Sequence, residues 1–329
     1  FMPLGSSLFI FFVLTFVNYF REELQRNTIR GAFGQYLSPA LVQQLTQDPD
    51  MLVLGGETRE ITVMFSDVRQ FTAISETYRN DPQGLTALMN RFLTPLSDVI
   101  MEGKGTIDKY MGDAIMAFWN APLDDEAHAR NGCDAALDML GRLDQLNRER
   151  QQEAEVDGEP FMPLRIGIGI ATGPAMVGNM GSDLRFDYSV LGDTVNLASR
   201  LEGLTRHYGV PILLAGETGR RGVGGMAALE IDQVQVRGRE AAEPIWALLG
   251  DKSLAADPEL QDFACGFAAA RTSYRTRQWS EAAKGLSALH PAASRLGIDG
   301  VVDRFAERSA QFESAPPPPD WNGVASLQG

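Results

Sequence analysis

The segment from Glu60 to Thr72 limits the possible folds more than any other part of this chain. Over the letters ITVMFS, large apolar side chains recur at every second position, which is the period that a strand of a sheet requires. Asp67 follows directly, at the point where the apolar run stops and a turn begins. A carboxylate at that point is not expected in the core, so Asp67 is a candidate ligand for a metal ion.

A second aspartate, Asp113, occupies a similar position. It follows the turn-like letters YMG and precedes another apolar run, AIMAF. Two carboxylates at strand ends suit a pair of divalent ions that clamp the attacking and the leaving oxygen of a phosphoryl transfer. Alone, Asp67 and Asp113 predict a two-metal site of the general kind found in polymerases, nucleases and phosphatases.

Composition excludes several classes of protein. The 329 residues are enough for one large domain or two ordinary ones, and an apolar fraction of 44% permits a sizeable core. The net charge of −14 argues against a nucleic-acid partner, because binding to a phosphate backbone needs clustered Lys and Arg. Cys133 and Cys265 lie far apart and in no ligand spacing, so neither a disulfide framework nor a zinc site is expected.

The chain opens with a strongly apolar stretch. Leu4 to Phe20 is about 17 residues long, the short end of the range for a membrane-spanning helix. A signal peptide is the alternative, but no basic segment precedes the run and no small-residue cleavage site follows it; a buried helix fits poorly because every face is apolar. We interpret residues 1–20 as the last helix of a membrane region that begins upstream. Arg21 and Arg26 mark the following side as cytoplasmic, which predicts a protein of the inner or plasma membrane.

Residues 21–54 are predicted to be a connector that couples this span to the rest of the chain. In residues 55–250, strand and helix patterns alternate, which favours an α/β or α+β sandwich. Apolar residues recur at helical spacing over Leu85–Ile100 and over Glu126–Arg148, so each of these segments is predicted to be a helix with one buried face.

Shorter elements lie between and after these helices. Thr106–Lys109 and Ala114–Phe118 are predicted to form a hairpin. The polar stretch Arg148–Pro160 is interpreted as a loop and Gly173–Gly181 as a glycine-rich turn region, before a helix over Thr194–Leu204.

Residues 251–329 have a different character. Aromatic and alanine residues over Leu260–Leu289 have the spacing of a helix-turn-helix, and the chain closes with four consecutive prolines from Pro316 and a tryptophan, Trp321. We interpret this part as a helical appendage with a proline-rich tail.

Four ordered blocks of sequence carry a family signature. They are FSDVRQFT from Phe65, KYMGD from Lys109, LRIG from Leu164 and LGDTVNLASRLE from Leu191. One block alone would be weak, but four in order are specific. Over residues 57–249 the chain resembles the class III nucleotide cyclases, in particular membrane-anchored bacterial adenylate cyclases linked to a sensor. The resemblance implies an α+β fold with a ferredoxin-like βαββαβ core, in which helices flank a mixed or antiparallel sheet.

The resemblance also assigns roles to the two aspartates. Asp67, Asp113 and the backbone carbonyl of Val68 would hold two Mg²⁺ or Mn²⁺ ions, which lower the pKa of the ribose 3′-hydroxyl and neutralise the phosphates. Asn196 and Arg200 lie four residues apart on a predicted helix and so share a face. In the family, Asn196 would orient the ribose and Arg200 would stabilise charge on the α-phosphate in the transition state. Taken singly, Asp67 could also be a helix N-cap and Asp113 a turn residue. Asn196 and Arg200 could be an exposed pair on a helix surface.

Further family positions bind the triphosphate. Arg165 and Arg237 match residues that hold it, and Phe71 and Thr72 follow Asp67 in a turn whose N–H groups would cradle phosphate oxygens. The family usually has lysine where this chain has Arg237, and a planar guanidinium binds phosphate with a different geometry.

Two positions concern the choice of base. Lys109 stands where adenylate-type members place a lysine that hydrogen-bonds the purine, and Ser189 occupies the partner position, usually aspartate. A lysine donor suits N1 of adenine and would meet a protonated N1 on guanine, which favours ATP. Ser189 resembles the subgroup with threonine there, which includes bicarbonate-responsive enzymes. Independent of the family, Lys109 could be a solvated hairpin charge and Ser189 a strand hydroxyl that faces water.

The family also implies a subunit arrangement. Each site is shared between two subunits, so that Asp67, Asp113 and Arg165 of one chain would face Lys109, Ser189, Asn196, Arg200 and Arg237 of its partner in a head-to-tail homodimer. The sequence thus predicts an adenylate cyclase that makes 3′,5′-cyclic AMP and pyrophosphate from ATP. A guanylate cyclase, and a catalytically silent nucleotide-binding module that transmits a signal, are the alternatives.

Overall fold

The computed structural model describes residues 9, 11–17, 56–158, 160–182, 185–235 and 242–326. The predicted connector at 21–54 lies outside these residues, as does most of the predicted span at 1–20. Within the ranges described, no helix combines the length and the apolar character needed to cross a membrane. Residues 11–17 are helical.

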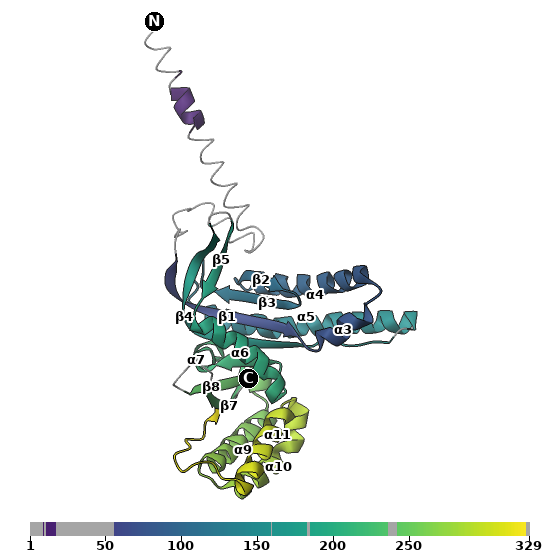
Figure 1. Cartoon of the computed structure of the whole chain (residues 1–329), viewed down its shortest axis with the longest axis vertical. Coiled ribbons are helices and arrows are strands. Elements are labelled where there is room, and N and C mark those ends of the chain that lie inside the picture. Colours follow the sequence, from purple (N-terminus) through teal and green to yellow (C-terminus); the bar gives the residue numbers. More distant parts are fainter. Residues whose placement is uncertain are drawn as a thin grey trace.

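A single mixed sheet organises the domain (Figure 1). Its strands run in the order β2-β3-β1-β4-β6-β8-β7-β9, and β5 pairs with β4 beside this path. The order β2-β3-β1-β4, with antiparallel neighbours, is that of a ferredoxin-like βαββαβ unit, and the parallel pair of β4 and β6 makes the sheet mixed. The predicted α+β fold is therefore confirmed. The strands are β1 (Glu57–Val68), β2 (Thr106–Met111), β3 (Ala114–Trp119), β4 (Ile166–Ser182), β5 (Arg185–Leu191), β6 (Ile212–Ala215), β7 (Ala227–Gln235), β8 (Glu243–Gly250) and β9 (Ala325–Ser326).

Helices cover both faces of this sheet. Helices α4 and α5 share one hydrophobic cluster with one face, while α6 packs on the other face against β4 and β1. The helices are α3 (Phe71–Thr77), α4 (Pro82–Glu102), α5 (His128–Asp157), α6 (Asp193–Tyr208), α7 (Gly216–Gly222), α8 (Lys252–Ala255), α9 (Pro258–Arg275), α10 (Trp279–Leu296) and α11 (Asp299–Ser314).

Strand β1 is covered on both faces. Ile61 and Val63 are fully buried in the cluster on the α6 side, whereas Met64 and Val68 are buried in the cluster on the α4 and α5 side. Successive side chains of a strand point to opposite faces, so a strand covered on both faces needs apolar residues at odd and even positions alike. The charged residue of this strand that the sequence singled out, Asp67, lies near its end.

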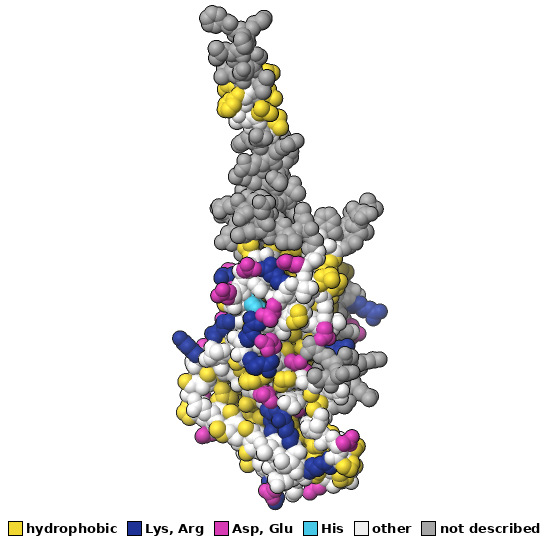
Figure 2. Space-filling view, turned by 90° about the vertical axis from the view of Figure 1, so that its left-hand side faces the viewer, with side chains coloured by type: hydrophobic (Ala, Val, Ile, Leu, Met, Phe, Trp, Pro, Cys, Tyr) yellow, Lys and Arg dark blue, Asp and Glu magenta, His cyan; other side chains and the backbone are white. Residues whose placement is uncertain are grey.

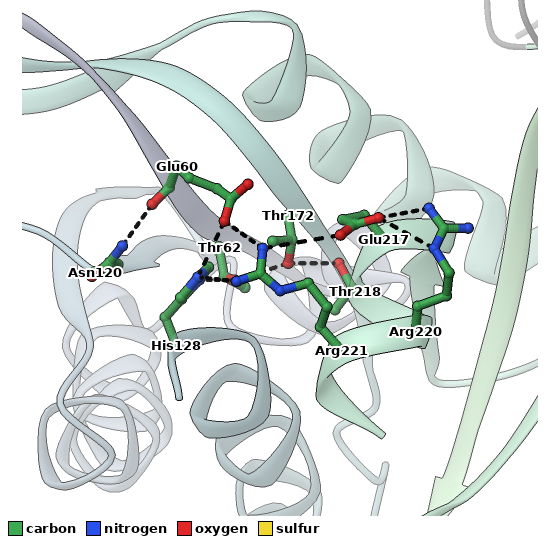
Figure 3. Close-up of polar contacts among 9 residues, drawn as sticks. All are labelled: Glu60, Thr62, Asn120, His128, Thr172, Glu217, Thr218, Arg220 and Arg221. Carbon is green, nitrogen blue, oxygen red and sulfur yellow. Dashed lines mark hydrogen bonds and ion pairs between the residues drawn. The ribbon is translucent and has the colours of Figure 1, made fainter. Parts of the chain in front are cut away.

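The buried hydroxyl of Thr62 belongs to a hydrogen-bonded network in this core (Figure 3). The hydroxyl of Thr62 lies 2.8 Å from Nδ1 of His128 and 2.8 Å from the hydroxyl of Thr172, to which Thr218 donates at 2.9 Å. Arg221 lies 3.2 Å from Nε2 of His128. A guanidinium can only donate, so Nε2 accepts and Nδ1 carries the ring proton. The polar groups of this network thus satisfy one another across β1, β4, α5 and α7.

Two segment predictions were wrong. Gly173–Gly181 is not a turn region but part of the long strand β4, which pairs with β1 over most of its length. Arg148–Pro160 is mostly not a loop, because α5 continues to Asp157 and ends at Gly158, whose φ of 70° suits a helix C-cap. Its last turns are polar but rich in Glu, Gln and Arg, which are good helix formers, and Arg91 of α4 pairs with Glu153 at 2.8 Å.

Helices α9 to α11 form a module that shares its core with the domain. In Figure 1 they lie together at one end of the sheet, next to α6 and β7. Buried residues of the module, such as Phe267 and Phe305, belong to the same hydrophobic cluster as Leu201 and Tyr208 of α6. The helix-turn-helix expected in residues 260–289 is present as α9 and α10.

Polar contacts fix the same module to the sheet. Arg308 of α11 donates to the buried carboxylate of Asp232 on β7 at 2.7 Å, and Tyr208 of α6 donates to that carboxylate at 2.7 Å. The proline-rich tail folds back: Arg277 donates to the carbonyl of Pro319 at 3.0 Å, and β9 then pairs in parallel with β7. On the face drawn in Figure 2, basic and acidic side chains are intermixed.

Candidate active site

The two aspartates predicted from the sequence lie side by side. Asp67 is the penultimate residue of β1, and Asp113 stands in the turn between β2 and β3, directly after Gly112, whose φ is 69°. The pairing of Ser66 with Ile115 brings the two strand ends together. Burial, together with the charge of Asp67, raises the pKa of Asp113. Two carboxylates therefore meet at one edge of the sheet, where the charge of Asp67 disfavours ionisation of Asp113.

Helix α6 adds a third acid and a cation to this edge. Arg206 lies with Nη2 3.4 Å from Oδ2 of Asp67. Burial, and after it the charge of Asp67, raises the pKa of Glu202 to about 7. One oxygen of Glu202 is buried and has no hydrogen-bond partner among the residues described. The helix can approach so closely because Gly169 of β4 has no side chain: a Cβ there would collide with the backbone of α6.

This arrangement fits divalent cations of the Mg²⁺ type. Such ions prefer oxygen ligands and are often held by one or two carboxylates together with water and substrate phosphates. Asp67 and Asp113 supply two carboxylates, and the carbonyl of Val68 is adjacent in the chain. In the described part of the chain, no group of three or more His, Cys, Asp or Glu side chains could hold a metal by itself. A cation here would also relieve the repulsion between the two carboxylates.

Residues predicted to bind the triphosphate lie at the same end of the sheet. Arg165 is exposed, directly precedes β4, and accepts a backbone hydrogen bond from Arg69 at 2.7 Å. Phe71 and Thr72, predicted to lie in a turn, are instead the first residues of the short helix α3. The turn precedes them at Gln70, whose φ of 58° is left-handed. Arg237 lies outside the described residues.

Asn196 and Arg200 are exposed on the surface of α6. Successive helical residues are rotated by about 100°, so these two side chains share one face, while Glu202 and Arg206 share another that is turned from the first by about 120°. Arg206 and Glu202 adjoin Asp67, whereas Asn196 and Arg200 are exposed. One helix therefore carries two pairs of polar side chains in different surroundings, and the pair Glu202 and Arg206 adjoins a carboxylate of the same chain.

Lys109 and Ser189 lie next to each other although they belong to different strands. Ser189 of β5 donates to a carboxylate oxygen of Asp108 at 2.7 Å, and Nζ of Lys109 lies 3.2 Å from the other oxygen. None of the hydrogen bonds or ion pairs described for this chain links Lys109 or Ser189 to Asp67 or Asp113. The two residues predicted to contact the base thus form one group of contacts, separate from the two aspartates predicted to hold metal ions.

Several site residues were missed by reasoning from the sequence. Glu202 and Arg206 are four apart on α6, a spacing that signals one helix face, but nothing in the sequence says that this face meets β1. Asp108 precedes Lys109, and strand alternation would place it on the opposite side. Arg69 follows Asp67 and donates to the carbonyl of Val210 at 3.1 Å, a contact between segments far apart in sequence.

The fold and the site together define a class of protein. A ferredoxin-like sheet carries two carboxylates at a strand end, and arginines surround this edge. Such an arrangement is compatible with binding of a polyphosphate through divalent cations.

Comparison with known proteins identifies the family. Residues 55–249 match the model of the adenylate and guanylate cyclase catalytic domain, and the chain belongs to this family. Adenylate cyclase 1 of Rhizobium meliloti (strain 1021) is 34% identical over 218 residues, which cover 66% of this chain and 32% of that protein. The adenylate cyclase of Anabaena cylindrica is 38% identical over 160 residues, which cover 49% and 30%. The match thus spans about a third of the length of these relatives.

Two solved cyclase structures are also similar to this chain. The guanylyl cyclase Cya2 is similar with a TM-score of 0.53 and 32% identity, over 60% of this chain and 95% of that chain. The adenylyl cyclase CyaB from P. aeruginosa gives a TM-score of 0.52 and 32% identity, over 60% and 97%. The predicted resemblance to class III cyclases is therefore confirmed.

Proposed function

We propose that this chain is an adenylate cyclase subunit that converts ATP to 3′,5′-cyclic AMP and pyrophosphate. The observation that carries the proposal is the division of α6 into two faces. Glu202 and Arg206 adjoin Asp67 in the same chain, whereas Asn196 and Arg200 point outward. The adenylate cyclases among the relatives support the same reaction.

The reaction closes a ring. The ribose 3′-oxygen bonds to the α-phosphorus while the bond from that phosphorus to the pyrophosphate oxygen breaks, and the hydroxyl proton passes to water. Two Mg²⁺ or Mn²⁺ ions, when bound, would lower the pKa of the hydroxyl and offset charge on the phosphates. Asp67 and Asp113, with the carbonyl of Val68, would hold them. Arg200 would stabilise the charge that develops on the α-phosphate, and Asn196 would orient the ribose.

A homodimer would complete two equivalent sites. In a head-to-tail arrangement, the outward face of α6 from one chain meets the carboxylate edge of the other. Exposed apolar side chains support an interface on this side of the molecule. They are Tyr110 (49% exposed) and Met111 (44%) of the β2 end, Met176 (51%) of β4 and Leu191 (59%) of β5. A monomer would then lack half of each site.

The remaining arginines fit the leaving group. Arg165 is exposed at the start of β4, on the same edge as the two aspartates, and would hold the triphosphate together with Arg237. Phe71 and Thr72 begin α3 directly beyond this edge, where backbone N–H groups of a first helical turn lack intrahelical partners.

The substrate is tested by a comparison of two nucleotides. The full chain at micromolar concentration is assayed with Mn²⁺ and either ATP or GTP. We expect cyclic AMP as the main product and a specific activity that rises with protein concentration. A preference for GTP, the substrate type named for the similar Cya2, would overturn the assignment of the base. Binding of ATP without any cyclic product would favour the silent nucleotide-binding module.

Membrane attachment is a separate part of the proposal. The apolar residues of segment 1–20 support a membrane anchor that leaves the catalytic domain in the cytoplasm. The full chain should sediment with membranes and stay there at high salt, and a chain that lacks residues 1–20 should not. Equal release of both proteins by salt would contradict an inserted anchor.

A further inference from the structure

Strand β2 is irregular at Asp108, directly before Lys109. Ile107 pairs with Ala117 of β3 and Lys109 pairs with Met116, so Asp108 is the extra residue of a β-bulge. In a regular strand, neighbouring side chains point to opposite faces, but a bulge re-aims a side chain and is frequent near functional sites. The bulge explains how Asp108 and Lys109, neighbours in the chain, come to contact each other through their side chains.

The Asp108 carboxylate joins the two residues assigned to the base. Its side chain is completely buried, with Oδ1 3.2 Å from Nζ of Lys109 and Oδ2 accepting the Ser189 hydroxyl at 2.7 Å. Lys109 remains 47% exposed, whereas Ser189 is 6% exposed. One buried acceptor therefore restrains a surface cation on β2 and a nearly buried hydroxyl on β5.

We propose that Asp108 is a positioning residue that sets the hydrogen-bonding polarity of the base subsite. A serine hydroxyl has one proton and two lone pairs, so by itself it can donate or accept. Because Ser189 gives its proton to Asp108, only lone pairs remain for a ligand. Asp108 thereby makes Ser189 an acceptor, and it holds the Lys109 amine as a donor beside it.

This polarity matches one purine edge. Adenine presents an acceptor at N1 and a donor at its 6-amino group, so it meets Lys109 and Ser189 correctly. Guanine presents a donor at N1 and an acceptor at O6, so both contacts would be mismatched. The same reasoning explains how Ser189 can take a position where the family usually has aspartate. Asp108, which directly precedes Lys109, makes the serine hydroxyl an acceptor. The inference rests on the proposed function, because it assigns the base subsite of that nucleotide site.

The test replaces Asp108 by its neutral isostere. In Asp108→Asn the amide can donate to Ser189 as well as accept, so the hydroxyl is no longer fixed as an acceptor and Lys109 loses its counter-charge. We expect the ratio of kcat/KM for ATP to kcat/KM for GTP to fall by about tenfold or more, since a mismatched polar contact costs at least that factor. The double variant Asp108→Asn/Ser189→Asp carries a permanent acceptor at position 189 and should restore the preference for ATP.

Asp232→Asn is the matched control. Asp232 is also buried, also accepts a hydroxyl, from Tyr208, and also pairs with a cation, Arg308, but it lies far from the base residues in the fold. This variant should lose stability and keep the ATP to GTP ratio. If Asp108→Asn behaves in the same way, with a changed melting temperature and an unchanged ratio, the inference is wrong.

Equilibrium binding tests the role of Asp108 without any need for catalytic turnover. Dissociation constants of non-hydrolysable ATP and GTP analogues are measured for wild type and both Asp108 variants. A loss of selectivity in binding with no cyclic product from any protein would sustain the role of Asp108 and defeat the cyclase proposal. Absence of selectivity in the wild type, in binding and in turnover, would overturn the role of Asp108.

Discussion

At the scale of single residues, His128 shows how a buried titratable group is kept neutral. Its ring is 2% exposed and lies between the Thr62 hydroxyl and the guanidinium of Arg221 (Figure 3). Burial, and after it the charge of Arg221, lowers the pKa of His128 below 6.5, while Glu60 and Asp125 act in the opposite direction. A proton on Nε2 would face a cation that can only donate.

This environment makes stability depend on pH. Because the pKa is lower in the folded chain than in the unfolded chain, only the unfolded state takes up this proton as the pH falls below about 6.5. The stabilisation is present above that pH and is lost below it. The free energy of unfolding of wild type should fall from pH 7.5 to pH 5.5 more steeply than that of His128→Gln, as measured by urea titration at each pH.

The effect of His128 is the difference between the unfolding free energies of wild type and His128→Gln at each pH. Glu202 has a raised pKa and so acts with the opposite sign, and His207 has a lowered pKa, but both are present in each protein and cancel. Parallel curves for wild type and His128→Gln would show that His128 does not titrate as described.

At the scale of elements, the packing of α6 on β4 determines the geometry of the site. This one helix supplies Glu202 and Arg206 to its own carboxylate edge and presents Asn196 and Arg200 outward. Its distance from the sheet is set by Gly169, where a Cβ would collide with the carbonyl of Ala198 and the amide of Glu202.

Gly169→Ala should therefore damage both stability and activity. Overpacking of this kind costs roughly 1–3 kcal/mol of unfolding free energy. A displacement of α6 by about 1 Å could also reduce the rate by about a hundredfold, because catalytic groups must be held in register. Denaturant titration and an assay of cyclic product measure the two effects.

Gly141→Ala is the matched control for this substitution. Gly141 lies inside α5, and no atom would stand within 4 Å of a Cβ there. Alanine at this helical position should stabilise the protein by roughly 0.5–1 kcal/mol and leave activity unchanged. Equal behaviour of the two variants would refute the role given to Gly169.

The elements also show what the sequence could and could not predict. The alternation of β1 and the helical spacing of α4 are local patterns, and they placed Asp67 and the core correctly. The strand through Gly173–Gly181 was missed because glycines signal turns locally, whereas here the backbone is held by pairing with β1 and, from Met176, with β5. Asp108 and Glu202 could not be assigned, because a bulge and the approach of α6 to β1 are tertiary features.

At the scale of the whole molecule, the module of helices α9 to α11 is part of the same cooperative structure. Its aromatic residues share a core with α6, and Arg308 forms a buried ion pair with Asp232. The side chains of these two residues are 12% and 2% exposed. The module thus braces β7 and also α6, the helix that carries Arg200.

Arg308→Met should destabilise the chain strongly. Removal of one partner leaves a buried charge without compensation, which costs about 3–5 kcal/mol. Arg295→Met is the comparison: this arginine pairs with Glu259 on the surface of the same module and should matter little. The double variant Asp232→Asn/Arg308→Met should recover part of the loss. Equal melting temperatures for Arg308→Met and Arg295→Met would contradict the bracing role.

The central claim is that each active site is shared between two chains, and complementation tests it most directly. Asp113→Asn and Arg200→Ala are each assayed alone and after co-expression with distinct affinity tags. Each variant alone should be inactive, because both of its sites lack one essential group. Random pairing makes half of the dimers mixed, and each mixed dimer has one intact site, so we expect about a quarter of wild-type activity. A mixture as inactive as the single variants would contradict a shared site.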